Sequence, residues 1–525
     1  MRREDAGPET CARRTAPPAC HTVARATTIN AGVLDDFLED VLNIFSACHI
    51  EVMNTELSVV DVRRSVRPPL SVGVVGAGPA GLAVARALLR RSSHVTITLF
   101  DPALGDPLLR GRGTPYRPDR ARPLLNAPLH HMSVDPDDAD QCTTWFASDP
   151  RAQGDSTYGS LTRPDFGRYL EAFLDDLPSY VGAHQTLALY PVEVTAIRPS
   201  EGGHMLLSPR CQLGRFDVAV LCTGWGTVRP EAGEHGTVQH AIDHVLHGPD
   251  VAIRGTGLTA VDHARALLVE SPSTRVVMTS RRGLLPGVRP APLPEDDWSP
   301  LVATVDEPEL GTVRALADHV LAEARRRGLA SDPISERVVQ APRPVPWLED
   351  GLEHVHAPSW RNLAVPVSEE LLPRAWHRWD RPQRRVFLRR FHPHVQSWCN
   401  PMPPSTARLL LGAMQEGRLV VRAGASSPSG RSRDTIDATR SGFQSSAPLD
   451  TPLVRCLVNS GLAVRDPFGG LVTTPGHRVV GPSGTAALFA VGALTQGAHY
   501  VVNALDVVVR QAARTADEIS QGACR

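Results

Sequence analysis

The sequence contains no lysine, so all 55 of its basic residues are arginine. Without a lysine amine, the chain cannot form a Schiff base with pyridoxal phosphate or with a carbonyl substrate. It also lacks the lysine of a P-loop, which excludes the usual ATPases.

Strong charge and long apolar runs are absent as well. The formal net charge is −1, which gives no general attraction to nucleic acid or to an anionic membrane. No uninterrupted apolar run approaches the ~20 residues of a membrane span, and the N-terminal stretch has no apolar core of a secretory signal. We therefore expect a cytoplasmic protein that binds neither nucleic acid nor membrane.

Cysteine patterns that carry chemistry are missing. The nine cysteines are scattered and include no pair in CxxC or CxxxxC spacing, which argues against a disulfide framework, a zinc knuckle and a redox-active disulfide. No GxSxG turn is present, so a Ser-His-Asp hydrolase has no support.

A glycine-rich turn follows the first buried strand pattern. The segment SVGVVGAGPAGLAVARALLRR leads from that strand through GAGPAG into a helix, and a second strand, VTITLFD, ends at Asp101. Gly76 permits a tight turn, Gly78 lets the backbone approach a pyrophosphate, and Gly81 lets the helix pack on the sheet. The helix N-terminus at Pro79-Ala80 offers free N–H groups to phosphates, and Asp101 can accept hydrogen bonds from a ribose.

A second copy of this unit begins at VAIRGTGLTAVDHARALL. It has Gly255 and Gly257, with Ala260 at the third position. Its second strand ends at Ser280-Arg281-Arg282. An acid there would repel a 2′-phosphate, whereas arginine binds one, so the sequence favours NADP over NAD. The alternative is that both arginines belong to a solvated turn.

Two nucleotide-binding units in one chain indicate two cofactors whose redox groups meet. A flavin and a nicotinamide are the natural pair, because hydride passes from one to the other. We therefore predict an enzyme that uses FAD and NADPH.

With these motifs the chain resembles a family of FAD/NAD(P)-binding flavoproteins related to class B and N-hydroxylating flavin monooxygenases. The resemblance covers about residues 68–520. The following segments carry it: VGVVGAGPAGLAVARAL, GRGTPYRPDRARPLLNAPLHHMSVDPDDADQCTTWF, LTRPDFGRYL, VLCTGWG, VAIRGTGLTAVD, TSRRGLLP, RRVFLRRFHPHVQSWCNPMPPSTARLLL and LFAVGALTQGAHYVVNALDVVVRQAA.

The resemblance implies which residues lie near the flavin. They are Leu125, Asn126, Met132, Thr223, Gly224 and Gly492. Ala493 departs from the pattern, because many relatives carry an acid there that binds the ribitol of the flavin. A backbone group must make that contact in this chain. The same segments offer Tyr116, Arg163, His499 and Tyr500 as pocket candidates without a stated role.

The resemblance also implies an α/β fold of two Rossmann-like dinucleotide-binding domains, with the NADP domain inserted into the FAD domain. The expected parts are a disordered extension (1–32), an amphipathic helix and linker (33–66), the first part of the FAD domain (67–240), the NADP domain with a helical insert (241–423), a loop or linker (424–447) and the C-terminal part of the FAD domain (448–525).

The expected reaction is a monooxygenation in specialised metabolism, with a small amine or amino acid and O2 as substrates and no side chain as a covalent nucleophile. The alternatives are a flavin dehydrogenase or oxidase without oxygen insertion, and a non-catalytic flavin-binding regulator.

Two further constellations have plain structural interpretations. His392, His394 and Cys399 resemble metal ligands, but the proline between the histidines disfavours helical spacing and no carboxylate is near in sequence, so we expect a packed or pocket-lining cluster. The arginines around Phe387 and Phe391 fit the charged outer face of a helix with an aromatic core face. The alternative is a carboxylate-binding rim, formed by Arg384, Arg385, Arg389 and Arg390.

Overall fold

The computed structural model describes ten stretches of the chain. These are residues 68–118, 123–149, 154–155, 160–225, 250–291, 298–304, 310–329, 343–424, 435–439 and 450–523. The extension expected over 1–32 and the helix and linker expected over 33–66 lie outside these residues.

A first sheet of the described residues has six strands in the order β16–β17–β9–β1–β2–β5. Their bounds are β1 Leu70–Val75, β2 Val95–Phe100, β5 Gln185–Tyr190, β9 Val218–Leu221, β16 Arg478–Gly481 and β17 Gly484–Ala490. Neighbours run parallel except for β16 and β17. The predicted strand–helix–strand unit is present as β1, α2 (Pro79–Arg91) and β2.

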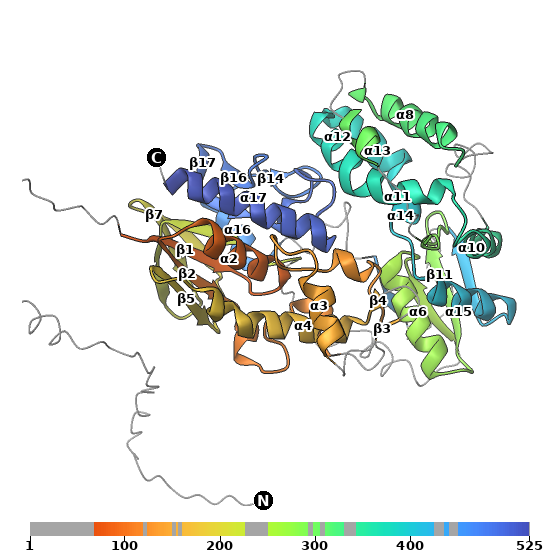
Figure 1. Cartoon of the computed structure of the whole chain (residues 1–525), viewed down its shortest axis with the longest axis horizontal. Helices are drawn as coiled ribbons and strands as arrows, with labels where there is room; N and C mark the ends of the chain where they lie inside the picture. The colour runs from red at the N-terminus through yellow and green to blue at the C-terminus, as the bar shows by residue number, and fades with distance from the viewer. Residues whose placement is uncertain are drawn as a thin grey trace, which may run out of the picture. The chain divides into compact units, whose positions relative to one another are not determined.

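Helices cover one face of this sheet and a small meander covers the other (Figure 1). The helical face is made by α2, α3 (Gln141–Ser148), α4 (Arg163–Asp176) and α17 (Leu505–Ala523). On the opposite face, the antiparallel strands β6 (Ala196–Ser200), β7 (Gly203–Leu207) and β8 (Gln212–Phe216) pack with α16 (Pro452–Asn459). Both faces of the parallel strands are thus buried, as their continuous apolar sequences predict.

A second sheet has the order β12–β11–β10–β13 with all pairs parallel. Its strands are β10 Asp250–Arg254, β11 Arg275–Ser280, β12 Leu419–Ala423 and β13 Thr435–Asp437, and α6 (Leu258–Glu270) and α15 (Pro404–Gln415) pack with them. In sequence, all four strands fall between β9 and β16.

One expected loop contains a strand. The segment 424–447 reads as a Ser- and Gly-rich linker, yet β13 lies within it and pairs with β10. Ile436 is buried in the core of the second sheet. A three-residue strand is too short to show an alternating pattern, which is why the sequence did not indicate it.

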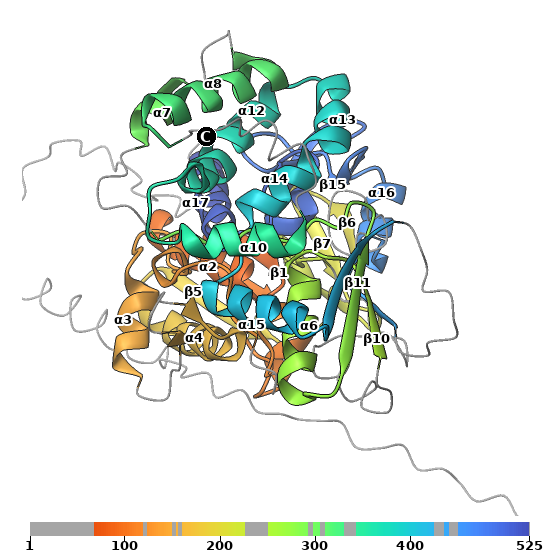
Figure 2. The same cartoon turned by 90° about the vertical axis from the view of Figure 1, so that its right-hand side faces the viewer.

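The described residues between β11 and β12 are mostly helical, as predicted (Figure 2). The elements are α7 Ser299–Ala303, α8 Val313–Arg326, α10 Pro344–Glu353, η7 Trp360–Leu363, α11 Ala364–Pro366, η8 Val367–Leu371, α12 Leu372–Arg378, α13 Arg381–Arg390, α14 His392–Cys399 and α15. The segment η8 is a π-helix. We call residues 343–399 the helical insert; its aromatic core centres on Trp376, Trp379 and Phe387.

Other element predictions differ from the structure by a few residues. The sequence patterns PDFGRYLEAFLD (164–175) and VEVTAI predict a helix and a strand, and a last helix is predicted from about Val502. The structure has these elements as α4, β6 from Ala196, and α17 from Leu505. Two short hairpins, β3–β4 (Gly154–Asp155 and Ser160–Leu161) and β14–β15 (Arg465–Asp466 and Gly469–Leu471), were not predicted. Within the described stretches, no helix is long and apolar enough to cross a membrane.

The close packing of α2 on its sheet gives a first prediction. A Cβ on Gly81 would lie 1.9 Å from the Gly76 carbonyl oxygen, which is backbone and cannot turn away. We expect Gly81→Ala to lower the free energy of unfolding by about 3 kcal/mol or more. The matched control is Gly412→Ala in α15, where a Cβ meets nothing within 4 Å. That change should be neutral or stabilise by up to about 1 kcal/mol. Equal urea midpoints for the two variants would contradict the packing argument.

Candidate functional site

The first glycine turn joins the ends of three strands. Gly76 has φ +106°, and a Cβ there would lie 2.4 Å from the Cys222 carbonyl oxygen. Its N–H donates to the Phe100 carbonyl at the end of β2 (2.8 Å), and the Cys222 N–H donates to the Val75 carbonyl (2.7 Å). Only glycine fits this backbone crossing.

The other two glycines of this turn also mark close approaches. Gly81 lies against the backbone of Gly76, as expected for helix–sheet packing. A Cβ on Gly78 would lie 3.2 Å from the Cα of Gly113, in the loop after β2. Within the described residues, no side chain caps the N-terminus of α2. The N–H groups that follow Pro79 in the first turn are therefore available to an anion.

Asp101 locks this turn through both carboxylate oxygens. Its Oδ2 accepts the Ala77 N–H (2.9 Å) and its Oδ1 accepts the Ala103 N–H (2.8 Å). Each oxygen retains a second lone pair. The predicted ribose contact therefore stays a prediction, and Asp101 has a structural role that the sequence pattern did not reveal.

The residues expected near the flavin lie at the carboxyl ends of the first sheet or in the segments beside it. Leu125 and Met132 are buried, whereas Asn126, Thr223 and Gly224 are half-buried. Gly224 has φ +60°, and a Cβ there would meet nothing within 4 Å.

Gly492, expected as a flavin contact, lies just after β17 with φ +77°. Its N–H donates to Oε1 of Gln511 in α17 (2.9 Å). Gln511 and Ala493 are both buried. The backbone contact with the flavin expected beside Ala493 stays a prediction.

The second glycine turn is more open than the first. Gly255 has φ +117°, and a Cβ there would lie 3.1 Å from the Ala438 carbonyl oxygen, just after β13. Around Gly257 a Cβ would meet nothing within 4 Å, and α6 begins there without a side-chain cap. Ala260 is fully buried against the second sheet. The N-terminus of α6 thus leaves space for a phosphate.

The turn after β11 separates its two arginines. Arg281 is exposed. Arg282 instead donates to the Arg389 carbonyl (2.8 Å) at the end of α13 and to Nε2 of His394 (2.6 Å). The Ser280 hydroxyl accepts the Gly283 N–H (3.0 Å) within the turn. We therefore correct the expectation for Arg282: it binds the C-terminal carbonyls of a helix, which attract cations, and is not free to bind a 2′-phosphate.

Two contacts connect the segments around the first and second sheets. Nη2 of Arg163, at the start of α4, lies 2.6 Å from Oδ2 of Asp262 in α6. Trp376 of the helical insert donates from Nε1 to the Gly497 carbonyl (2.7 Å). The Tyr116 hydroxyl lies close enough to Arg163 for the positive charge to lower its pKa. Burial has the larger effect and raises the pKa of Tyr116 above its usual value.

The residues proposed as metal-like ligands bind different partners. His394 accepts from Arg282, while Nδ1 of His392 lies 2.9 Å from the Tyr500 hydroxyl. Burial lowers the pKa of His392 to about 4 and raises that of the Cys399 thiol. The packed, pocket-lining interpretation accounts for these contacts.

The arginines of α13 have structural contacts as well. Arg384 donates to the Trp376 carbonyl (2.9 Å) and lies over the Trp376 ring, 4.9 Å from its centroid. Phe387 is buried, as the aromatic core face predicts.

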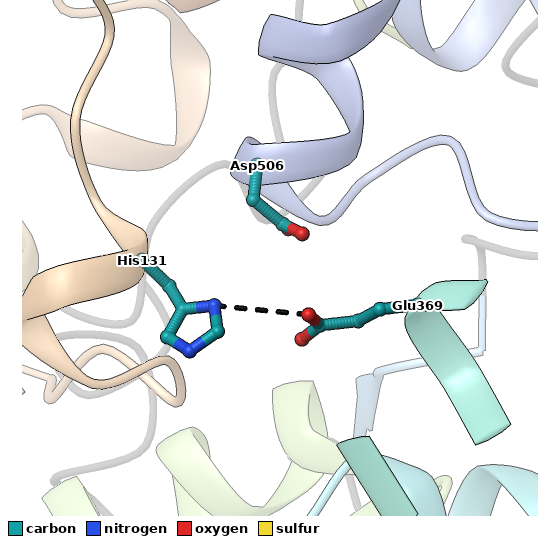
Figure 3. Close-up of side chains that lie close together, drawn as sticks. All are labelled: His131, Glu369 and Asp506. Atoms are coloured by element: carbon teal, nitrogen blue, oxygen red, sulfur yellow. Dashed lines mark ion pairs between the residues drawn. The ribbon is translucent and has the colours of Figure 1, made fainter. Parts of the chain in front are cut away.

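A set of acid–base side chains that the sequence did not indicate lies at the junction of three segments (Figure 3). We call His131, Glu369 and Asp506 the junction cluster. Their ligand atoms all lie within 4.8 Å of one another, with 3.7 Å between His131 Nδ1 and a Glu369 oxygen. Only His131 neighbours a residue that the resemblance singles out, namely Met132. No spacing rule links the three positions.

Burial dominates the electrostatics of the junction cluster. It raises the pKa of Glu369 to about 8, and the Asp506 carboxylate acts in the same direction. Arg510 and Arg289 oppose that shift. Burial also lowers the pKa of His131, and neighbouring His130 adds to this effect.

Three further histidines stack where α12 meets the C-terminal segments. The His499 ring lies 4.7 Å from that of His377 and 4.5 Å from that of His477, measured between centroids. Among the described non-glycine residues, only His477 has a positive φ, +66°. It is 1% exposed, and burial lowers its pKa to about 3.

The described residues contain two strand–glycine turn–helix units of the kind that binds dinucleotides. Residues 73–226 match the family model described as FAD-NAD(P)-binding. This match confirms, for that part of the chain, the predicted relation to FAD/NAD(P)-binding flavoproteins. It also supports the prediction of an oxidoreductase that uses FAD and a nicotinamide dinucleotide.

Solved structures to which the chain is similar include an N-hydroxylase and two monooxygenases. An ornithine N-hydroxylase from Kutzneria sp. 744 is 15% identical (TM-score 0.49; 87% of this chain and 100% of that chain covered). An L-lysine 6-monooxygenase from Pseudomonas syringae is 14% identical (TM-score 0.46; 86% and 99%). A flavin-containing monooxygenase from Stenotrophomonas maltophilia is 15% identical (TM-score 0.39; 87% and 100%). No curated protein matches the sequence.

Substitution of either of the two arginines after β11 should change nucleotide binding in a different way. Arg281→Ala should raise the KM for NADPH about tenfold and leave that for NADH within a few-fold, because only NADPH carries a 2′-phosphate. Arg282→Ala should affect both nucleotides alike, since its partners are α13 and His394. Steady-state kinetics with both nucleotides measures this. Equal effects of Arg281→Ala on NADPH and NADH would refute the NADP assignment.

The low pKa of His477 gives a prediction for acid stability. A folded-state pKa of about 3, against about 6.5 in the unfolded chain, means that the unfolded chain binds the proton first. The contribution of His477 to the free energy of unfolding is therefore fully present above pH ~6.5. It is lost as the pH drops toward 3, by up to about 1.4 kcal/mol per pH unit. His477→Asn, which tolerates a positive φ, should reduce this slope in denaturation curves from pH 7 to 4. An unchanged slope would show that His477 does not ionise on unfolding.

Proposed function

We propose that the chain is an FAD-dependent oxidoreductase that uses NADPH, with the NADPH domain inserted into the FAD domain. The observation that carries this proposal is the duplication of one unit: a buried strand, a glycine turn and a helix with an uncapped N-terminus. In sequence, the strands of the second sheet fall between β9 and β16 of the first. On this basis we assign 67–240 and 448–525 to the FAD domain and 241–423 to the NADPH domain, which we now extend to include β13.

For FAD, the proposed cradle is the N-terminus of α2. Its N–H groups at Ala80 and Gly81 would face the pyrophosphate, and Asp101 would bind the ribose with the lone pairs that Ala77 and Ala103 leave free. The open backbone at Thr223-Gly224, where a Cβ on the glycine meets no atom within 4 Å, provides room beside this cradle. These residues fit a dinucleotide.

For NADPH, the proposed cradle is the N-terminus of α6 at Gly257, where the structure leaves open space. Exposed Arg281 would bind the 2′-phosphate, and the Arg282 bond to α13 would position the turn that carries it. Ser280 holds the same turn through Gly283.

FAD, when bound, accepts hydride from NADPH and passes electrons to O2. We propose that the chain directs this chemistry to N-hydroxylation of a small amine or amino acid, because its sequence resembles N-hydroxylating flavin monooxygenases. Buried Leu125 and Met132 would exclude water near the reacting atoms. No side chain is assigned as a nucleophile.

The test begins with the purified protein, which should be yellow and release FAD rather than FMN on denaturation. Anaerobic NADPH should bleach the flavin absorbance. In air, with a panel of amines and amino acids, a monooxygenase should oxidise NADPH to NADP+ while one oxygen atom of O2 converts the amine into a hydroxylamine and the other leaves as water. Release of hydrogen peroxide alone would indicate an oxidase. A colourless protein that takes up no FAD would refute the proposal.

A variant in the second glycine turn isolates the NADPH site. Gly257→Val adds a side chain whose Cβ would meet no atom of the described residues within 4 Å, at an ordinary φ of −78°. Folding and FAD content should therefore be unchanged. The rate of anaerobic bleaching by NADPH should fall at least about tenfold, because the new side chain occupies the space for the pyrophosphate. An unchanged rate would place NADPH elsewhere.

A further inference from the structure

We propose that the junction cluster, His131, Glu369 and Asp506, binds one divalent transition-metal ion at a site separate from both glycine turns. The class of ion is Mn(II), Fe(II), Co(II) or Zn(II). This inference is independent of the proposed function, because it depends on these side chains and their neighbours alone.

The geometry brings three suitable ligands together from three segments. His131 ends η3 (Leu129–His131), Glu369 lies in the π-helix η8, and Asp506 lies in the first turn of α17. In Figure 3 the three side chains extend into one common space. Two ligands on one ion lie at most about 4.2 Å apart, twice a bond of ~2.1 Å. The observed spread of up to 4.8 Å therefore requires only small side-chain movements.

The two carboxylates are half-buried and incompletely hydrogen-bonded. Oδ2 of Asp506 is shielded from solvent and accepts no hydrogen bond from the described residues. The Glu369 side chain is 24% exposed, and His131 faces it at 3.7 Å. Two half-buried carboxylates this close repel each other unless a proton or a cation lies between them. A π-helix turn is also common at functional sites.

Two arginines already lie beside the cluster, and they define what an ion must displace. Arg510 lies 3.1 Å from Asp506 Oδ2, but its side chain is 44% exposed and can turn into solvent. Arg289 acts on Glu369 through its charge, and its own Nη2 donates to the Pro401 carbonyl (3.4 Å). Arg510 is thus the cation that competes with a metal ion for Asp506.

The donor set selects the class of ion. One imidazole with two carboxylates is richer in nitrogen than the oxygen-only sites of Ca²⁺ or Mg²⁺ and contains no thiolate for Cu(I). Three protein ligands leave at least one coordination position for water or another small ligand.

The experiment uses Co²⁺ alone as the probe on the full-length, flavin-loaded protein after treatment with a chelator. Isothermal titration should show a site with one Co²⁺ per chain, and Zn²⁺ should compete for it. His131→Ala, Glu369→Gln and Asp506→Asn should each weaken binding at this site at least about tenfold. Circular dichroism and flavin content check that each variant is folded.

A neighbouring residue supplies a matched control. His130→Ala changes the same residue type one position away and should leave Co²⁺ affinity within about twofold. Arg510→Gln should strengthen binding about tenfold, because it removes the competing cation. A purely structural cluster would not give that gain. Absence of Co²⁺ binding, or binding that none of the three cluster variants weakens, overturns the proposal.

Discussion

The structure depends on a backbone crossing at the first glycine turn. There the chain leaves β1, meets the end of β9 at Cys222 and turns into α2, so closely that a Cβ on Gly76 or Gly81 would overlap a carbonyl oxygen. Asp101 fixes the same turn to the end of β2 through two backbone N–H groups. Three strands and a helix are thereby held in one arrangement. The N-terminus of α2 points its free N–H groups past the edge of the sheet, where a phosphate can bind.

The second glycine turn obeys the same local rule with a looser fit. A Cβ on Gly257 has open space around it, and Ala260 is tolerated where the first turn requires glycine. The second turn has fewer close backbone contacts than the first, and side-chain contacts with the helical insert hold it in place. Arg282 binds the end of α13 and His394, and His392 of α14 contacts Tyr500. The turn that we assign to the NADPH ribose is therefore in contact with the insert, which in turn reaches the C-terminal segments.

Sequence analysis predicted what is encoded locally. Gly76, Gly81 and Gly255 could be assigned because a turn needs its glycines within six residues of each other and next to a strand. The contacts of Arg282 could not be predicted, because its partners lie more than a hundred positions away. An arginine without those partners would have the same local sequence. The hydrogen bond from the Gly492 N–H to Gln511 could not be predicted for the same reason, because Gln511 belongs to another element. The junction cluster joins three distant segments, so no motif could indicate it.

The junction cluster shows how the absence of lysine shapes the charge balance. Glu369 and Asp506 are neighboured by Arg289 and Arg510, and arginine cannot lose its proton to relieve an unfavourable site. The adjustable groups are therefore the carboxylates and His131, and burial shifts the pKa of Glu369 and of His131 in opposite directions. Glu369 belongs to the helical insert, whereas His131 and Asp506 flank the first sheet. Any proton or cation that settles between these side chains therefore also joins the insert to the proposed FAD domain. Because Arg282 joins the same insert to the proposed NADPH turn, the insert has charged contacts with segments of both proposed domains.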